Sequence, residues 1–201
     1  MYRLPVYTFT AMDIATTDAK IPDYTVIITG ATDYRNNLMV LEIWKQKGSN
    51  PINRMKEVTR QVLHYQSRVL GIEENRAEDF IDMYEWLLDR GEWAQEFGEI
   101  SRSIVNRIQR LPHYTQSKRD RIIDRLQPII NAHSLWLTKD LSWLADNLDI
   151  YPQIEYDDDI DALEMLRYIA RPPSEDLNIS GYEEENSLTV LEYNPITMCW
   201  N

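Results

Sequence analysis

The chain has 201 residues, of which 43% are hydrophobic, so it can bury the core of one compact domain and is too apolar for a disordered chain. Its single cysteine, Cys199, excludes both a disulfide framework and a zinc–cysteine site. A formal net charge of −12 argues against simple, constitutive binding to nucleic acid, because attraction to phosphate requires lysine and arginine.

The first part of the chain contains three runs of strand-like composition: residues 5–15, 24–31 and 38–45. In the first run, Tyr7, Phe9 and Ala11 occupy alternate positions, which is the period of two of a pleated strand. The connections between the runs are short, which favours antiparallel pairing. We therefore predict a three-stranded antiparallel meander.

After residue 50 the apolar residues recur every three or four positions, which indicates helices. The predicted helices are residues 51–65, 77–90, 118–131, 140–147 and 158–170. Further strands are predicted at residues 69–72, 103–111 and 135–137, whereas residues 93–98 fit no single pattern. This order of elements indicates a mixed sheet covered by helices, in an α/β or α+β domain.

The C-terminal segment has a different composition from the rest of the chain. From residue 175 onward it contains six acidic residues and no lysine or arginine. Its apolar run at residues 188–191 fits either part of a disordered tail or an added edge strand. We therefore divide the chain into one domain, residues 1–172, and an acidic C-terminal tail, residues 173–201.

Two carboxylates lie on predicted strands, one within the first strand and one at the end of a later strand. Asp13 continues the alternation of Tyr7, Phe9 and Ala11, so it lies on the row of a buried stripe, where a carboxylate is costly unless it is paired or binds a cation. Glu73 ends the short strand 69–72, at the carboxyl end where α/β domains place ligands. Both positions suit a metal or catalytic site.

A third acidic group begins the helix predicted at residues 158–170. Asp157 and Asp158 each share a helix face with Asp161, because they precede it by four and by three positions. Clustered carboxylates repel one another, and Mg²⁺ or Mn²⁺ would relieve that repulsion through the oxygen ligands that these ions prefer. Helix capping and the helix dipole explain one or two of these aspartates without any chemistry.

A basic stretch interrupts the acidic chain between residues 102 and 125. It contains seven lysines and arginines against two aspartates: Arg102, Arg107, Arg110, Lys118, Arg119, Arg121 and Arg125 against Asp120 and Asp124. Such a stretch fits either a solvated helix face or a set of phosphate contacts.

Four ordered motifs resemble the nuclease domain of phage terminase large subunits, a branch of the ribonuclease H-like superfamily. They are Ala-Met-Asp-Ile-Ala at residues 11–15, Ile-Glu-Glu-Asn at 72–75, Ser-Lys-Arg-Asp-Arg-Ile at 117–122, and Asp-Asp-Asp-Ile-Asp-Ala-Leu at 157–163. The resemblance covers about residues 8 to 171. In that family an acidic residue precedes an asparagine by two positions, so the match to Asn75 selects Glu73 over Glu74.

The resemblance implies a ribonuclease H-like mixed β-sheet flanked by helices, and an endonuclease that cuts concatemeric viral double-stranded DNA during genome packaging. It implies two Mg²⁺ or Mn²⁺ ions held by Asp13, Glu73 and either Asp157 or Asp158, with Asp161 as a further candidate. It also implies DNA contacts in the basic stretch. Our candidates for these are Arg102, Arg107, Lys118, Arg119 and Arg121.

Terminase large subunits also carry an ATPase motor, but the phosphate-binding motif G-x-x-x-x-G-K-[ST] is absent from this sequence. The chain is therefore either an excised nuclease domain or a free-standing relative. Its implied partners are the ATPase domain, the small terminase subunit and the portal. No apolar run reaches the roughly 18–20 residues of a membrane span, so we expect no membrane association and a soluble protein of the host cytoplasm.

Two other functions fit the same residues. A Holliday-junction resolvase of this fold would share the layout of acidic residues. An acidic protein-interaction module of the same fold, which has lost the chemistry, would lack metal binding altogether.

Overall fold

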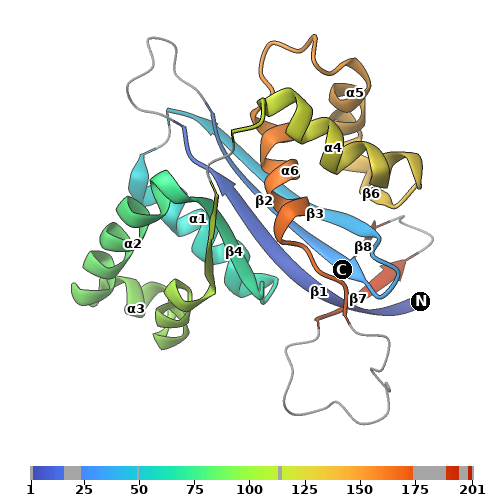
Figure 1. The fold of residues 1–201 in the computed structure, drawn as a ribbon. Coiled ribbons are helices and arrows are strands. Elements are labelled where there is room, and N and C mark those ends of the chain that lie inside the picture. Colours follow the sequence, from blue (N-terminus) through green and yellow to red (C-terminus); the bar gives the residue numbers. More distant parts are fainter. Residues whose placement is uncertain are drawn as a thin grey trace.

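The computed structural model describes residues 2–15, 24–48, 50–112, 115–173, 189–194 and 199–200. Its centre is a mixed β-sheet with the strand order β5-β4-β1-β2-β3-β6 (Figure 1). The strands are β1 (Tyr2–Asp13), β2 (Tyr24–Asp33), β3 (Leu38–Lys47), β4 (Val69–Glu73), β5 (Ile108–Leu111) and β6 (Leu135–Leu137). Strands β1, β2 and β3 form the predicted antiparallel meander. β4 joins β1, β5 joins β4 and β6 joins β3, all in parallel.

The C-terminal segment adds two strands to this sheet. Strand β7 (Thr189–Asn194) pairs antiparallel with the first half of β1, and β8 (Cys199–Trp200) pairs with β7. β1 is long enough for β4 to pair with its second half and β7 with its first. For the apolar run at residues 188–191, the edge-strand interpretation therefore agrees with the structure from residue 189 onward.

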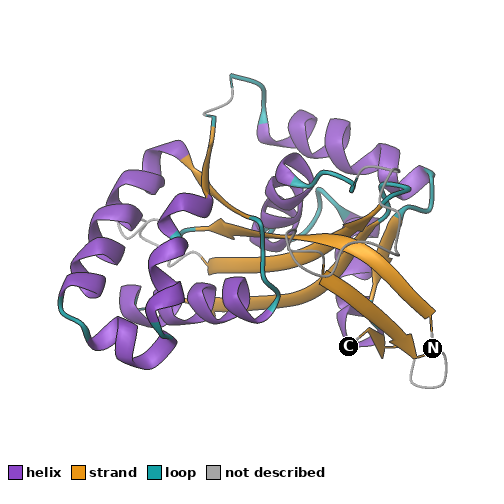
Figure 2. Cartoon of the chain, turned by 90° about the horizontal axis from the view of Figure 1, so that it is seen from below, coloured by secondary structure: helices purple, strands orange, loops and turns teal. Residues whose placement is uncertain are grey.

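Helices cover both faces of the sheet (Figures 1 and 2). One face carries α1 (Pro51–His64), α2 (Glu74–Asp89) and α3 (Glu92–Phe97); the other carries α4 (Lys118–Asn131), α5 (Ser142–Ile150) and α6 (Asp158–Ile169). Local signals fix two of the helix starts, because Asn50 caps α1 and Ser117 caps α4 through side-chain oxygens. In the described ranges, no helix combines the length and apolar character needed to cross a membrane.

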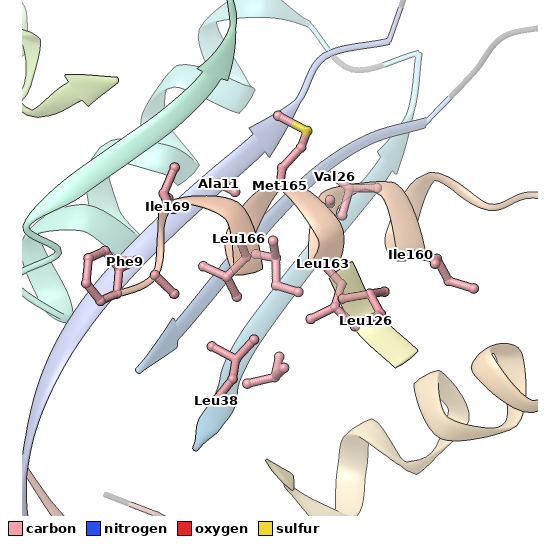
Figure 3. Close-up of a cluster of buried hydrophobic side chains, with 14 of the residues drawn as sticks. Phe9, Ala11, Val26, Leu38, Leu126, Ile160, Leu163, Met165, Leu166 and Ile169 are labelled. Carbon is pink, nitrogen blue, oxygen red and sulfur yellow. The ribbon is translucent and has the colours of Figure 1, made fainter. Parts of the chain in front are cut away.

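The alternation along β1 divides its side chains between two hydrophobic cores. Phe9 and Ala11 belong to the core under α4 and α6, whereas Met12 belongs to the core under α1 and α2. Figure 3 shows the first core, where Leu163, Leu166 and Ile169 of α6 lie against the strands.

Helix α6 packs very close to the sheet because a glycine lies beneath it. A Cβ atom added to Gly30 of β2 would stand 2.8 Å from Cδ2 of Leu166 and 2.8 Å from the backbone oxygen of Met39, so any larger residue would force the helix or the neighbouring strand away. This close packing fixes where the N-terminal turn of α6 lies relative to β1.

The strand predicted at residues 103–111 is mostly wrong. Only Ile108–Leu111 forms a strand, whereas Glu99–Ser103 and Val105–Arg107 form 3₁₀ helices. Ile104 is fully buried between these turns in the core under α1 and α2, so burial there does not follow a strand's alternation. The ambiguous residues 93–98 lie largely in α3.

Candidate functional site

Asp13 and Glu73 end two adjacent parallel strands. Met12 of β1 is paired with Ile72 of β4, so the next residue of each strand is one of the two carboxylates. Because the strands are parallel, their carboxyl ends lie at the same edge of the sheet. Both side chains are partly exposed there. The structure thus brings together two residues that are 60 positions apart in the sequence.

The first turn of α6 brings further carboxylates towards Asp13. Asp158 and Asp161 are buried, with relative exposures of 6% and 7%. Burial, followed by the carboxylates of Asp161 and Glu73 and to a smaller extent Asp158, raises the pKa of Asp13 well above its usual value. Lys118 acts in the opposite direction and does not outweigh them. Four of the predicted site residues therefore form one electrostatically coupled group.

Lys118, the first residue of α4, supplies positive charge to this group. Its ammonium nitrogen lies 2.9 Å from Oδ1 of Asp157 and 3.1 Å from Oδ2 of Asp161. Burial alone would lower the pKa of Lys118, but Asp161 and Asp157 outweigh burial and raise it. Lys118 is therefore a permanent cation beside the carboxylates.

The next turns of α4 and α6 are joined by buried ion pairs. Arg121 is bound to Asp161, and its Nε lies 3.1 Å from Oε2 of Glu164. Arg125 also binds Glu164, which is fully buried. Arg121 is only 9% exposed and is engaged by two carboxylates, so its geometry favours a structural role over the predicted contact with DNA. Sequence reasoning overlooked Glu164, although it lies three positions after Asp161 on the same helix face.

The acidic run 157–161 does not act as one unit. Asp159 is fully buried and points away from the site, where it accepts hydrogen bonds of 2.8 Å from both Lys45 of β3 and Asn147 of α5. Asp157 is the N-cap residue of α6 and contacts Lys118. Asp158 and Asp161 are the members that influence Asp13. Sequence alone left the choice among Asp157, Asp158 and Asp161 open, and this geometry favours the last two.

Of the five predicted DNA-contacting residues, two lie far from the carboxylates. Arg107 precedes β5 and donates a 2.8 Å hydrogen bond to the backbone oxygen of Ser67, which precedes β4. This position is at the opposite end of the parallel strands from Glu73. Arg102 pairs with Glu99 in the same region. By contrast, Arg119 is exposed in the first turn of α4, beside Lys118.

The donor chemistry of the site fits a hard divalent cation, because the residues around Asp13 are carboxylates. Within the described ranges, however, no three His, Cys, Asp or Glu side chains already stand where they could enclose an ion. Asp161 is instead held by Lys118 and Arg121. The chemistry of these carboxylates therefore suits a divalent cation, but their side chains would have to move closer together to bind one.

By sequence, neither a protein-family model nor a curated protein matches this chain. By structure, it is similar to the large terminase nuclease from thermophilic phage G20c, with a TM-score of 0.52, 14% identity and 83% of each chain covered. The same nuclease with bound zinc gives a TM-score of 0.51 and 17% identity, covering 84% of this chain and 88% of that one.

The yeast mitochondrial Holliday junction resolvase also matches, with a TM-score of 0.40 and 12% identity over 80% of this chain and 77% of that one. The described part of the chain therefore has a mixed α/β, ribonuclease H-like fold of the kind found in large terminase nucleases, as its four motifs predicted.

Proposed function

We propose that this chain is a metal-dependent endonuclease that cleaves double-stranded DNA, and that it processes concatemeric viral genomes during packaging. The observation that carries this proposal is the meeting of Asp13 and Glu73, at adjoining strand ends, with Asp158 and Asp161 from the first turn of α6. The fold shared with large terminase nucleases supports it.

Asp13, Glu73, Asp158 and Asp161 would hold Mg²⁺ or Mn²⁺, and Asp157 is the weaker candidate because, unlike Asp158 and Asp161, it is not among the carboxylates that raise the pKa of Asp13. One or two such ions, when bound, would activate water and stabilise the leaving oxygen of a phosphodiester. These four carboxylates stand where the carboxyl ends of β1 and β4 meet the first turn of α6. Asp13 binds a cation in its deprotonated form, so its raised pKa makes metal binding weaker at low pH.

Lys118 and Arg119 are the best-placed of the predicted DNA contacts, because they begin α4 beside the carboxylates. A helix N-terminus also favours phosphate groups. With a net charge of −12, the isolated chain should nevertheless bind DNA weakly and with strong salt dependence. Tethering to a terminase ATPase domain, a small terminase subunit or a portal would compensate for that weakness.

The central experiment is cleavage of supercoiled plasmid in Mn²⁺ or Mg²⁺. Asp13→Ala, Glu73→Gln and Asp158→Asn should each reduce nicking and linearisation by at least about a hundredfold, because even outer-shell partners of a metal contribute 10–100-fold. The matched control is Glu74→Gln, which changes the exposed neighbour of Glu73 and should leave cleavage unchanged. Full activity in the Asp13→Ala and Asp158→Asn variants would refute the proposal.

Two further measurements separate the alternatives. A preference of about a hundredfold or more for four-way junctions over linear duplex would identify a resolvase instead. Millimolar Mn²⁺ should raise the thermal midpoint of the wild-type protein, because a ligand that binds only the native state stabilises it. An unchanged midpoint together with no cleavage would identify an inactive interaction module.

A further inference from the structure

A cavity of about 730 Å³ opens beside the carboxylates, between α1 and α2. Its wall includes Ile14, which directly follows Asp13, and Arg76, which lies three residues after Glu73. Apolar side chains of α2, among them Phe80 and Met83, line the rest together with the start of α1. The cavity therefore lies near the carboxyl ends of β1 and β4, on the face of the sheet that carries α1 and α2.

Two arginines line this cavity without a carboxylate partner. The side chains of Arg54 of α1 and Arg76 of α2 make no hydrogen bond or ion pair with any residue that the structure describes. The Nε atom of Arg54 is buried and lacks a hydrogen-bond acceptor. Burial and the nearby charge of Arg76 lower the pKa of Arg54. Both arginines are partly exposed, and their side-chain donors that no protein group uses are available to an anion.

Acidic residues near the cavity do not satisfy these arginines. Asp79 and Asp82 of α2 also line it, but both are exposed to solvent and neither forms an ion pair with Arg54 or Arg76. Exposed carboxylates are screened by water and weaken anion binding only modestly. An anion with several oxygen acceptors suits the pair best, and arginine binds phosphate through paired N–H donors.

We propose that this cavity, the Arg54–Arg76 pocket, binds a backbone phosphate of the DNA strand next to the cleavage site. The assignment rests on the proposed nuclease function, and on the place of the cavity, whose lining residues Ile14 and Arg76 follow closely after Asp13 and Glu73 in the chain. The apolar wall suits the sugar or base attached to that phosphate. Trp86, which is 53% exposed, adds apolar surface to this wall, and the guanidinium of Arg90 lies over its ring, 4.8 Å from the ring centroid.

The first test measures binding of a fluorescein-labelled DNA duplex by anisotropy, with Ca²⁺ in place of Mg²⁺. The double variant Arg54→Met/Arg76→Met should bind about tenfold more weakly, and its dependence of log affinity on log salt should fall by about one. The matched control is Arg60→Met, on the same helix, because Arg60 is already paired with Glu57 and Glu42. Equal affinity and salt dependence for the double variant and the wild type would overturn the proposal.

The second test separates DNA from free phosphate and from misfolding. Inorganic phosphate should raise the thermal midpoint of the wild type but not of the double variant, whose own midpoint should be no lower than that of the wild type. If phosphate stabilises only the wild type while DNA affinity is unchanged, the pocket takes a free anion and the DNA assignment is wrong. The plasmid-cleavage assay tests the nuclease function separately. If no cleavage is seen, the nuclease function is refuted, but comparing duplex binding by the wild type and the double variant still shows whether the pocket binds DNA.

Discussion

Near the candidate site, the basic residues on the two sides of the sheet differ in their partners, although others on the α1–α2 side, such as Arg60, are paired. On the α4–α6 side, Lys118, Arg121 and Arg125 are bound to carboxylates of the acidic helix. On the α1–α2 side, Arg54 and Arg76 have no carboxylate partner among the described residues. In the sequence, the basic residues of α4 fit a phosphate-binding stretch. In the structure, Arg121 and Arg125 instead form ion pairs that join α4 to α6. Basic residues that lack an internal partner are better candidates for binding a phosphate, because their charge is not already compensated.

The largest expected effect comes from breaking the α4–α6 ion pairs. Arg121→Met should lower the free energy of unfolding by about 3–5 kcal/mol, because it removes one partner of a buried pair and leaves Asp161 and Glu164 less compensated. Urea denaturation measures this loss. Arg102→Met, which changes an exposed arginine paired only with Glu99, should stay within about 0.5 kcal/mol of the wild type. A similar loss in both variants would show that the buried α4–α6 ion pairs stabilise the fold no more than an exposed pair does.

A smaller loss is expected where the acidic helix meets β3. Lys45→Met should cost about 1–3 kcal/mol, because it leaves the fully buried Asp159 with Asn147 as its remaining side-chain donor. The urea midpoint should fall while Mn²⁺ still raises the thermal midpoint, since Asp159 faces away from Asp13. Loss of the Mn²⁺ effect in this variant would show that Asp159 belongs to the metal site after all.

Asp13→Asn should stabilise the metal-free protein at neutral pH. The pKa of Asp13 is raised in the folded state by burial and by Asp161 and Glu73, so its stabilising contribution is present below its unfolded pKa and is lost as the pH rises through the folded pKa. The variant and wild type should therefore have similar stability near pH 4 and diverge towards pH 8. Urea titrations at both pH values test this. A gain that is larger at low pH would contradict the sign of the shift.

The smallest effect is expected at the unpartnered arginines. Arg54→Met should raise the free energy of unfolding by on the order of 1 kcal/mol or less, because it removes a half-buried charge whose Nε has no acceptor. The direction of the change in unfolding free energy is the informative result, because Arg121→Met is expected to lower that free energy. A clear destabilisation by Arg54→Met would mean that Arg54 already has a stabilising partner in solution.

Much of the fold was predictable because it follows from local patterns. The meander, the helix over Lys118–Asn131 and the parallel strand at Val69–Glu73 each carry a clear period of two or of 3.6 in their apolar residues. The segment before Ile108 was not predictable, because short 3₁₀ turns have no such period and their burial depends on the helices packed over them.

The sequence by itself determined which carboxylates end strands and begin a helix, since Asp13, Glu73 and the aspartates at 157–161 stand at the boundaries of regular apolar patterns. Only the tertiary structure decided which of these carboxylates meet. The parallel pairing of β1 with β4 brings Asp13 to Glu73, and the close packing of α6 over Gly30 directs Asp158 and Asp161 towards them while Asp159 turns to Lys45. The carboxylate that pairs with an arginine often comes from a distant part of the sequence. The sequence alone therefore does not show whether an arginine binds a carboxylate of its own chain or is available to a phosphate.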